Sequence, residues 1–261
     1  VTVTGVDDNL IDGTITSTVT ASVVDAASDN NFDSVNDQTV SVTTTDDDVA
    51  GFTIAESGGS TSVAETGTTD TFTVVLNAQP DSNVVLSITS SDTDEATVTG
   101  SITFTPGDWD TAQTVTVTGV DDNIIDGTIT STLTIAVVDS ISDDNFDSVD
   151  DQTVSATTTD NDTAGFTITE TGGSTSVSES ATTDTFTVVL DAQPASNVVI
   201  SVTSDDTGEA TVSTGTLTFT SGNWNTPQTV TVTGVNDSVD DENQVTAVTL
   251  AIVDANSDNN F

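Results

Sequence analysis

The chain of 261 residues contains no lysine, arginine or histidine, although it carries 43 acidic side chains. No ion pair between an acidic and a basic side chain can therefore form anywhere in it. Carboxylates that lie close together must be separated, protonated or neutralised by a cation from outside the chain. At neutral pH we expect that cation to be a metal ion, so the placement of the acids becomes the main question.

Other absences exclude whole classes of function. Without cysteine there are no disulfides and no thiolate metal ligands, and without basic side chains nothing can contact nucleic-acid phosphates. The net charge of −43 also opposes binding to an anionic membrane. No stretch is long enough for a transmembrane helix, and no signal peptide is visible. The chain starts inside a strand pattern, so we expect it to be a window of a longer polypeptide.

Catalysis has few chemical groups to draw on. Ser–His–Asp and Cys–His arrangements are impossible because histidine and cysteine are absent. A pair of carboxylates of the glycosidase type remains as an alternative. It needs one acid kept protonated in an apolar pocket, and no apolar segment of the sequence encloses an acid. We therefore predict that the chain is not an enzyme.

The strongest internal pattern is a repeat of about 114 residues. The segment that begins with Val1-Thr-Val-Thr-Gly-Val-Asp-Asp recurs at Val115, and a variant of it recurs at Val230. Trp109 recurs as Trp224 in the same way. The period suits one immunoglobulin-sized sandwich per repeat. We predict the end of one repeat over residues 1–48, a complete repeat over 49–162, and a repeat that lacks its last strand over 163–261.

Apolar residues alternate with threonine along short segments, which is typical of antiparallel sheet with one buried face. The complete repeat is predicted to have seven such strands, and Trp109 is expected to cap its core. The predicted strands are Gly51–Glu56, Thr71–Asn77, Asn83–Thr89, Ser101–Thr105, Gln113–Val120, Thr128–Val138 and Thr153–Thr159. The predicted fold is all-β: tandem immunoglobulin-like sandwiches with Greek-key connections, joined end to end.

Strand direction assigns the acids to the two ends of each sandwich, because alternate loops of an antiparallel sandwich lie at the same end. One end, the lower end, is predicted to collect acids from four segments of the complete repeat: Glu65; Asp92, Asp94 and Glu95; Asp121, Asp122 and Asp126; Asp160 and Asp162. The other end collects the acids between the last two strands, and we expect junction sites between repeats at Asp139, Asp143, Asp144 and Asp147.

Two interpretations of these acids stay open. Generic surface acidity keeps proteins soluble and needs no specific site. It predicts acids on exposed strand faces with glutamate well represented, whereas here aspartate outnumbers glutamate by about five to one and the acids lie in loops. Aspartate is also a good turn former. Four acidic segments that converge on one end favour specific cation binding. Calcium, which takes 6–8 oxygen ligands, suits a chain without histidine or cysteine ligands.

The acidic segments resemble those of the Calx-beta family, the calcium-binding sandwich modules of sodium–calcium exchangers and of many large bacterial surface proteins. The matching segments are Ser62-Val-Ala-Glu65, Phe104-Thr-Pro-Gly107, Val115-Thr-Val-Thr-Gly-Val-Asp-Asp-Asn123 and Asp160-Asn-Asp162. The same pattern is similar to tandem repeats of giant bacterial adhesins.

The resemblance implies a set of calcium ligands in each repeat. In the complete repeat they are Glu65, Asp121, Asp122, the carbonyl of Ile124, Asp126, Asp160 and Asp162. In the first repeat they are Asp7, Asp8, the carbonyl of Leu10, Asp12, Asp46, Asp47 and Asp48. In the third they are Glu179, Asp237, Asp241 and Glu242. The third repeat departs from the pattern, since Asn236 replaces the first aspartate of its pair.

Taken together, these features predict a calcium-rigidified stalk or fibre repeat of a very large extracellular bacterial protein, an adhesin or a surface filament. The alternative is an adhesin domain that binds a glycan or a protein directly. Near-identical units with few aromatic residues favour a stalk. The expected cofactor is Ca²⁺. The expected partners are adjacent repeats and other copies of the chain in lateral or end-to-end association, with neither nucleic acid nor membrane insertion.

Overall fold

The computed structural model describes residues 1–239 and 242–261, and the chain is all-β, as predicted. Contacts divide the chain into two compact units. The first unit comprises Val1–Val63, Gly67–Gly119 and Thr130–Thr157. The second comprises Ala64–Thr66, Val120–Ile129 and Thr158–Phe261. Among the described residues, no helix has the length and apolar character needed to cross a membrane.

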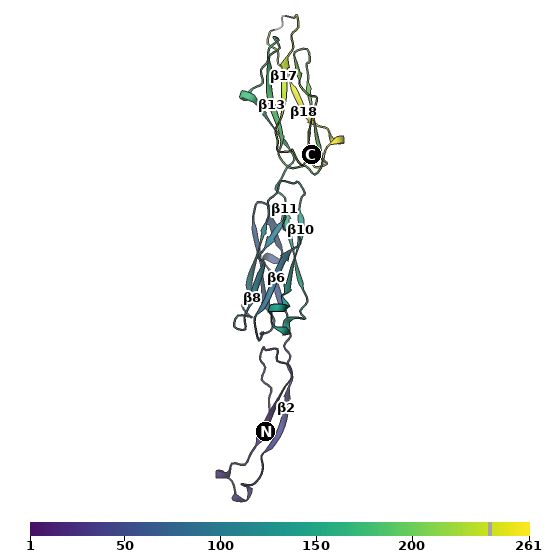
Figure 1. Cartoon of the computed structure of the whole chain (residues 1–261). Helices are drawn as coiled ribbons and strands as arrows, with labels where there is room; N and C mark the ends of the chain where they lie inside the picture. The colour runs from purple at the N-terminus through teal and green to yellow at the C-terminus, as the bar shows by residue number, and fades with distance from the viewer. Residues whose placement is uncertain (240–241) are drawn as a thin grey trace. The chain divides into compact units, whose positions relative to one another are not determined.

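The complete repeat forms two antiparallel sheets, and Figure 1 shows β8, β6, β10 and β11 of one of them. The first sheet has the order β3-β5-β9-β7, with bounds Phe52–Glu56, Thr69–Leu76, Gln113–Gly119 and Ala96–Val98. The second has the order β4-β11-β10-β6-β8, with bounds Thr61–Ala64, Gln152–Thr159, Ile129–Val137, Val84–Ser90 and Ser101–Phe104.

Apolar side chains of both sheets pack into one core. Phe72 on β5 pairs with Val115 on β9, and both are fully buried. Trp109 is half-buried against this core, which confirms its expected position. All seven predicted strands are present, with ends within two residues of the prediction. The short strands β4 and β7 were not predicted from the sequence.

The third repeat forms a similar pair of sheets in the second unit. The order β12-β13-β17-β15 has bounds Phe166–Glu170, Thr183–Leu190, Gln228–Gly234 and Ala210–Val212. The order β16-β14-β18 has bounds Thr216–Phe219, Val198–Ser204 and Val248–Ile252. Within the described part of the repeat, this second sheet has no counterpart of β4 or β11.

The first repeat contributes a two-stranded sheet of β1, Ile15–Ala21, and β2, Gln38–Thr44. Every residue of β1 is exposed. Short 3-10 turns occur in the loops of the three repeats. They are η1 Asp25–Ala27, η2 Asn30–Phe32, η3 Ser57–Gly59, η4 Asp139–Ile141, η5 Asp144–Phe146, η6 Thr171–Gly173 and η7 Asp254–Asn256.

Candidate metal centre

Glu65 is a buried carboxylate at the end of a strand. It directly follows β4, and its backbone N–H donates to the carbonyl of Thr159 at 3.1 Å. This bond continues the pairing of β4 with β11 by one residue and draws the side chain inward, so that Glu65 is only 1% exposed. Its carboxylate accepts a hydrogen bond from the N–H of Asn161 at 3.2 Å. Burial, reinforced by the neighbouring carboxylate of Asp160, raises its pKa.

Asp160 and Asp162 bring two further carboxylates to Glu65. One carboxylate oxygen from each of the three residues lies within 4.8 Å of the others. The Oδ2 atom of Asp162 is buried and has no hydrogen-bond partner. Burial raises the pKa of Asp162, and the charge of Asp160 raises it further. A buried oxygen of this kind is costly unless it is protonated or bound by a cation.

Asp160 also shapes the loop after β9. Its Oδ2 atom accepts from the N–H of Asp126 at 3.1 Å and from that of Gly127 at 2.9 Å. Gly127 has a φ of 78°, a conformation that glycine adopts at little cost. The Oδ1 atom of Asp160 accepts from the N–H of Asp162 at 2.6 Å. One carboxylate therefore holds both acidic segments in place.

Asp121 and Asp122 lie in the same loop and are tied into it by hydrogen bonds. Oδ1 of Asp122 accepts from the N–H of Ile124 at 2.6 Å, which closes a tight turn. Oδ1 of Asp121 accepts from the side-chain amide of Asn161 at 2.9 Å. Each carboxylate keeps a second oxygen, and the charges of both raise the pKa of Asp162.

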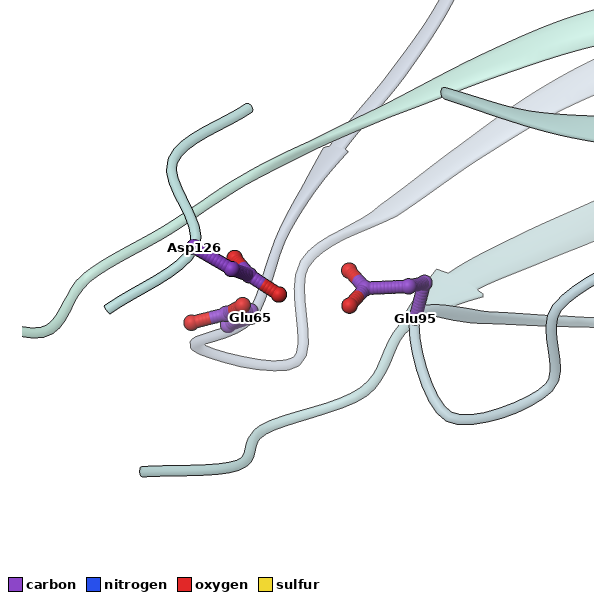
Figure 2. A group of neighbouring side chains, drawn as sticks. All are labelled: Glu65, Glu95 and Asp126. Atoms are coloured by element: carbon purple, nitrogen blue, oxygen red, sulfur yellow. The ribbon is translucent and has the colours of Figure 1, made fainter. Parts of the chain in front are cut away.

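Glu95 belongs to the same group of acids. Strand direction predicted that it lies at this end of the sandwich, but it was not predicted to be a ligand. It directly precedes β7 and is 6% exposed. One oxygen each of Glu65, Glu95 and Asp126 lie within 4.8 Å of one another. Figure 2 shows the three side chains close together, with those of Glu95 and Asp126 directed toward each other. The signal that could have found Glu95 is its recurrence as Glu209 before a second Ala-Thr-Val.

The arrangement offers only oxygen donors, several of them on buried or half-buried residues. Calcium takes carboxylate, carbonyl and water oxygens in flexible geometry, so the residues present fit this ion. Zinc and copper prefer nitrogen or sulfur ligands, which the chain cannot offer as side chains. Close carboxylates with raised pKa and no basic side chain are the electrostatic condition that a divalent cation relieves.

The first repeat builds the same loop from its own acids. Asp46 accepts from the N–H groups of Gly13 at 2.8 Å and Asp48 at 2.9 Å, as Asp160 does from Gly127 and Asp162. These backbone hydrogen bonds lower the pKa of Asp46, whereas burial raises that of Asp48. The predicted ligands of this repeat line one cavity of about 320 Å³, namely Asp7, Asp8, Asp12, Asp46, Asp47 and Asp48.

The carbonyl of Leu10 was also predicted to be a ligand. It accepts the N–H of Asp12 at 3.0 Å, while Oδ1 of Asp8 accepts the N–H of Leu10 at 3.0 Å. The counterpart of this second bond, from Ile124 to Asp122, shows that the turn is the same in both repeats.

The third repeat does not gather its predicted ligands. Glu179, the counterpart of Glu65, is exposed. Asp237 accepts the N–H of Val239 at 2.8 Å, and Glu242 has a φ of 66°. Asp241 lies outside the described residues. No group of three close carboxylates is found among the described residues of this repeat.

The four junction candidates do not behave alike. Asp143 is 5% exposed and accepts from the N–H of Ser82 at 2.7 Å and from that of Asn145 at 3.0 Å. Its carboxylate therefore fastens two loops of the sandwich. Asp139, Asp144 and Asp147 are exposed. Partial loss of hydration around its carboxylate raises the pKa of Asp147, and so does the charge of Asp139.

The loop after β9 and its counterpart in the first repeat also contact the next repeat in sequence. One of these contacts lies within the first unit and the other within the second. In the first unit, Leu10 forms a parallel bridge with Gln79, and the amide of Asn145 donates to the carbonyl of Ile11 at 3.3 Å. In the second unit, the counterparts are the bridge of Ile124 with Gln193 and the bond from Asn260 to Ile125 at 2.7 Å. The contact is thus built twice from equivalent residues.

Comparisons with known proteins give no family assignment. No protein-family model matches the sequence, and no curated protein matches it. Among solved structures, CBD12 from CALX1.2 is 14% identical with a TM-score of 0.31, covering 76% of this chain and 79% of that one. The apo-form Calx CBD1 domain is 13% identical with a TM-score of 0.32, covering 42% of this chain and 98% of that one.

Surface-layer protein SbsC, domains 4–9, is 20% identical with a TM-score of 0.31. The alignment covers 82% of this chain and 33% of SbsC. At these identities and TM-scores, the likenesses supply no argument for a function. The functional argument therefore rests on the residues of the chain itself.

Proposed function

We propose that the chain is a calcium-rigidified structural repeat, part of the stalk or fibre of a very large extracellular bacterial protein such as an adhesin or surface filament. The observation that carries the proposal is the group Glu65, Asp160 and Asp162. It combines a carboxylate that is 1% exposed with a buried Asp162 oxygen that lacks a hydrogen-bond partner. No side chain of the sequence can supply the missing positive charge.

Calcium at this group, and at Asp126 beside Glu65, neutralises carboxylates from three chain segments. Asp160 and Asp162 follow β11, Glu65 follows β4, and Asp126 belongs to the loop after β9. An ion bound by these oxygens ties the loop to the ends of two strands. Without the ion, the same carboxylates repel one another, and the end of the sandwich loosens.

The loop that binds the ion is also the loop that contacts the next repeat. The carbonyl of Asn123 accepts a hydrogen bond from Gln193, and that of Ile125 accepts one from Asn260. Asp122 and Asp126 flank this stretch of the loop. Ordering of the loop by calcium therefore stiffens its attachment to the following repeat. This coupling suits a stalk, because a chain of sandwiches stays extended only as far as its joints resist bending.

The experiment compares the chain in excess calcium and in excess chelator. We expect calcium to raise the thermal unfolding temperature and to increase the maximum dimension measured by small-angle X-ray scattering. Magnesium at equal concentration is the control, since it demands octahedral geometry and keeps more of its water. Equal dimensions and equal unfolding temperatures with calcium and with chelator would contradict the proposal.

A further inference from the structure

The dipeptide Asp-Gly occurs twice in the sequence, and both occurrences lie at the same position of the repeat. They are Asp12-Gly13 in the first repeat and Asp126-Gly127 in the complete repeat. Asp126 and Gly127 are exposed and lie in the loop between β9 and β10, outside any strand. A predicted metal ligand, Asp126, is therefore followed by the one residue type that has no Cβ atom.

An aspartate that precedes glycine is open to attack by its own main chain. The amide nitrogen of the glycine adds to the side-chain carboxyl carbon of the aspartate, and no Cβ atom on the glycine hinders the approach. A C–N bond forms, and the hydroxyl of the carboxyl group leaves with the amide proton as water. The cyclic imide then takes up water at either of its carbonyls. Opening at the side-chain carbonyl restores aspartate, whereas opening at the main-chain carbonyl gives isoaspartate.

The nitrogen that would attack is held by Asp160. The N–H of Gly127 donates to Oδ2 of Asp160 at 2.9 Å, and the N–H of Asp126 donates to the same oxygen at 3.1 Å. Attack on the carboxyl carbon of Asp126 requires the peptide group of Gly127 to rotate. The two hydrogen bonds oppose this rotation, so the reaction depends on how firmly Asp160 holds the loop.

The charges around the loop determine how firmly it is held. One oxygen each of Glu65, Glu95 and Asp126 lie within 4.8 Å of one another, and Asp160 brings an oxygen equally close to Glu65. No basic side chain of the sequence offsets these charges. A cation among the oxygens draws the loop and Asp160 together, whereas without it the carboxylates repel one another. An exposed loop under such repulsion opens at a low free-energy cost.

We propose that Asp126-Gly127 is a modification site, at which aspartate isomerises spontaneously to isoaspartate when the metal centre holds no calcium. Bound calcium suppresses the reaction, because it keeps the N–H of Gly127 on Asp160 and the carboxylate of Asp126 on the ion. The suppression by calcium rests on the proposed function. The reactivity of the calcium-free dipeptide does not, since it follows from the exposed Asp-Gly sequence and the crowded carboxylates.

Isomerisation removes a ligand from the metal centre. Isoaspartate has one more methylene in the main chain and one fewer in the side chain than aspartate. The carboxylate of residue 126 is therefore displaced from the oxygens of Glu65 and Glu95, and calcium added later does not restore it. The same chemistry applies to Asp12-Gly13 in the first repeat, where the N–H of Gly13 donates to Asp46 at 2.8 Å.

The test follows the uptake of oxygen-18 from labelled water, because each passage through the imide introduces one oxygen atom from water into residue 126. The chain is aged at neutral pH in chelator and in calcium, and peptide mapping by mass spectrometry with electron-transfer fragmentation locates the label and the isoaspartate. We expect both at residue 126 in chelator. Calcium at a hundred times its Kd leaves roughly one chain in a hundred without the ion, so labelling should slow by up to about a hundredfold.

Two controls separate the dipeptide from its surroundings. Asp126→Glu keeps a carboxylate but needs a larger ring, so its labelling in chelator should fall to background. Asp122 lies in the same loop before Asn123, whose Cβ atom hinders attack, and should take up far less label than Asp126. Absence of label at Asp126 in chelator, or equal labelling of Asp122, would overturn the modification site.

Equal labelling of Asp126 in calcium and in chelator would overturn its suppression by calcium. A calorimetric titration of the freshly prepared chain then distinguishes the two proposals. Calcium uptake at the Glu65 group with no effect on labelling refutes only the present inference. No calcium uptake refutes the proposed function as well.

Discussion

Replacement of Glu65 by glutamine separates the charge of the buried carboxylate from its shape. The amide has nearly the same size, and its oxygen can still accept the hydrogen bond from the N–H of Asn161. What disappears is a negative charge, 1% exposed, beside Asp160 and Asp162. In chelator this removes repulsion, so we expect Glu65→Gln to unfold at a higher temperature than the parent chain.

Calcium reverses the order of the two proteins. A ligand present at a hundred times its Kd stabilises the native state by about 2.7 kcal/mol. For a sandwich of this size, that stabilisation raises Tm by roughly 10 °C. The parent chain should show this rise, while Glu65→Gln, which has lost a ligand at the centre of the group, should show at most a small part of it.

Tryptophan fluorescence makes the assay specific to the complete repeat. Trp109 and Trp224 are the only tryptophans, and each packs against a different core. In a Trp224→Phe background, Trp109 alone reports unfolding of the complete repeat. The matched control is Glu179→Gln, the same change at the corresponding but exposed residue, which should leave the calcium response of Trp109 unaltered. Our reasoning is refuted if Glu65→Gln lowers Tm in chelator and keeps the full calcium response.

Three further predictions follow from individual contacts. When a chelator keeps calcium away, the pKa of Glu65 is raised, so its contribution to stability is present below the ordinary carboxylate pKa and is lost as pH rises through the raised value. Denaturant titrations should therefore show the parent chain losing stability relative to Glu65→Gln between these two pH values. A difference in stability that stays constant with pH would contradict this. Asp143→Ala should cost about 1–2 kcal/mol by chemical denaturation, because it leaves the N–H groups of Ser82 and Asn145 without an acceptor, whereas Asp144→Ala, at an exposed residue, should cost at most about 0.5 kcal/mol. Gly234→Ala places a Cβ atom in steric conflict with the carbonyl oxygen of Ser178 and should cost roughly 1–3 kcal/mol. Gly215→Ala has open space around its Cβ atom and should be nearly neutral in the same measurement.

The sequence predicted the strands well because their chemistry is local. Period-2 alternation marks a strand with one buried face wherever it occurs, and Phe72 and Val115 illustrate the result. The short strands β4 and β7 carry too few residues for alternation to be read. They are defined by their partners: β7 by its pairing of Ala96 with Gly119, and β4 by its place beside β11.

The candidate site could be predicted from the sequence only in part, because strand direction assigns a loop to one end of the sandwich but does not determine how its side chains point. Asp92, Asp94 and Glu95 occupy one loop, yet only Glu95 is buried. Likewise, Glu65 and Glu179 hold the same position in the repeat. Glu65 is buried where its N–H bonds to the carbonyl of Thr159, whereas Glu179 is exposed. Burial here depends on a strand about ninety residues away in the chain.

The most direct test of calcium binding at Glu65 is a calorimetric titration of calcium into the parent chain, Glu65→Gln and Glu179→Gln. The account predicts saturable binding to the parent chain and to Glu179→Gln with the same stoichiometry. It predicts that Glu65→Gln binds fewer ions per chain, since the remaining carboxylates no longer enclose a complete set of ligands. A Glu65→Gln protein that takes up as many ions as the parent chain, with the same affinity, would contradict the central claim.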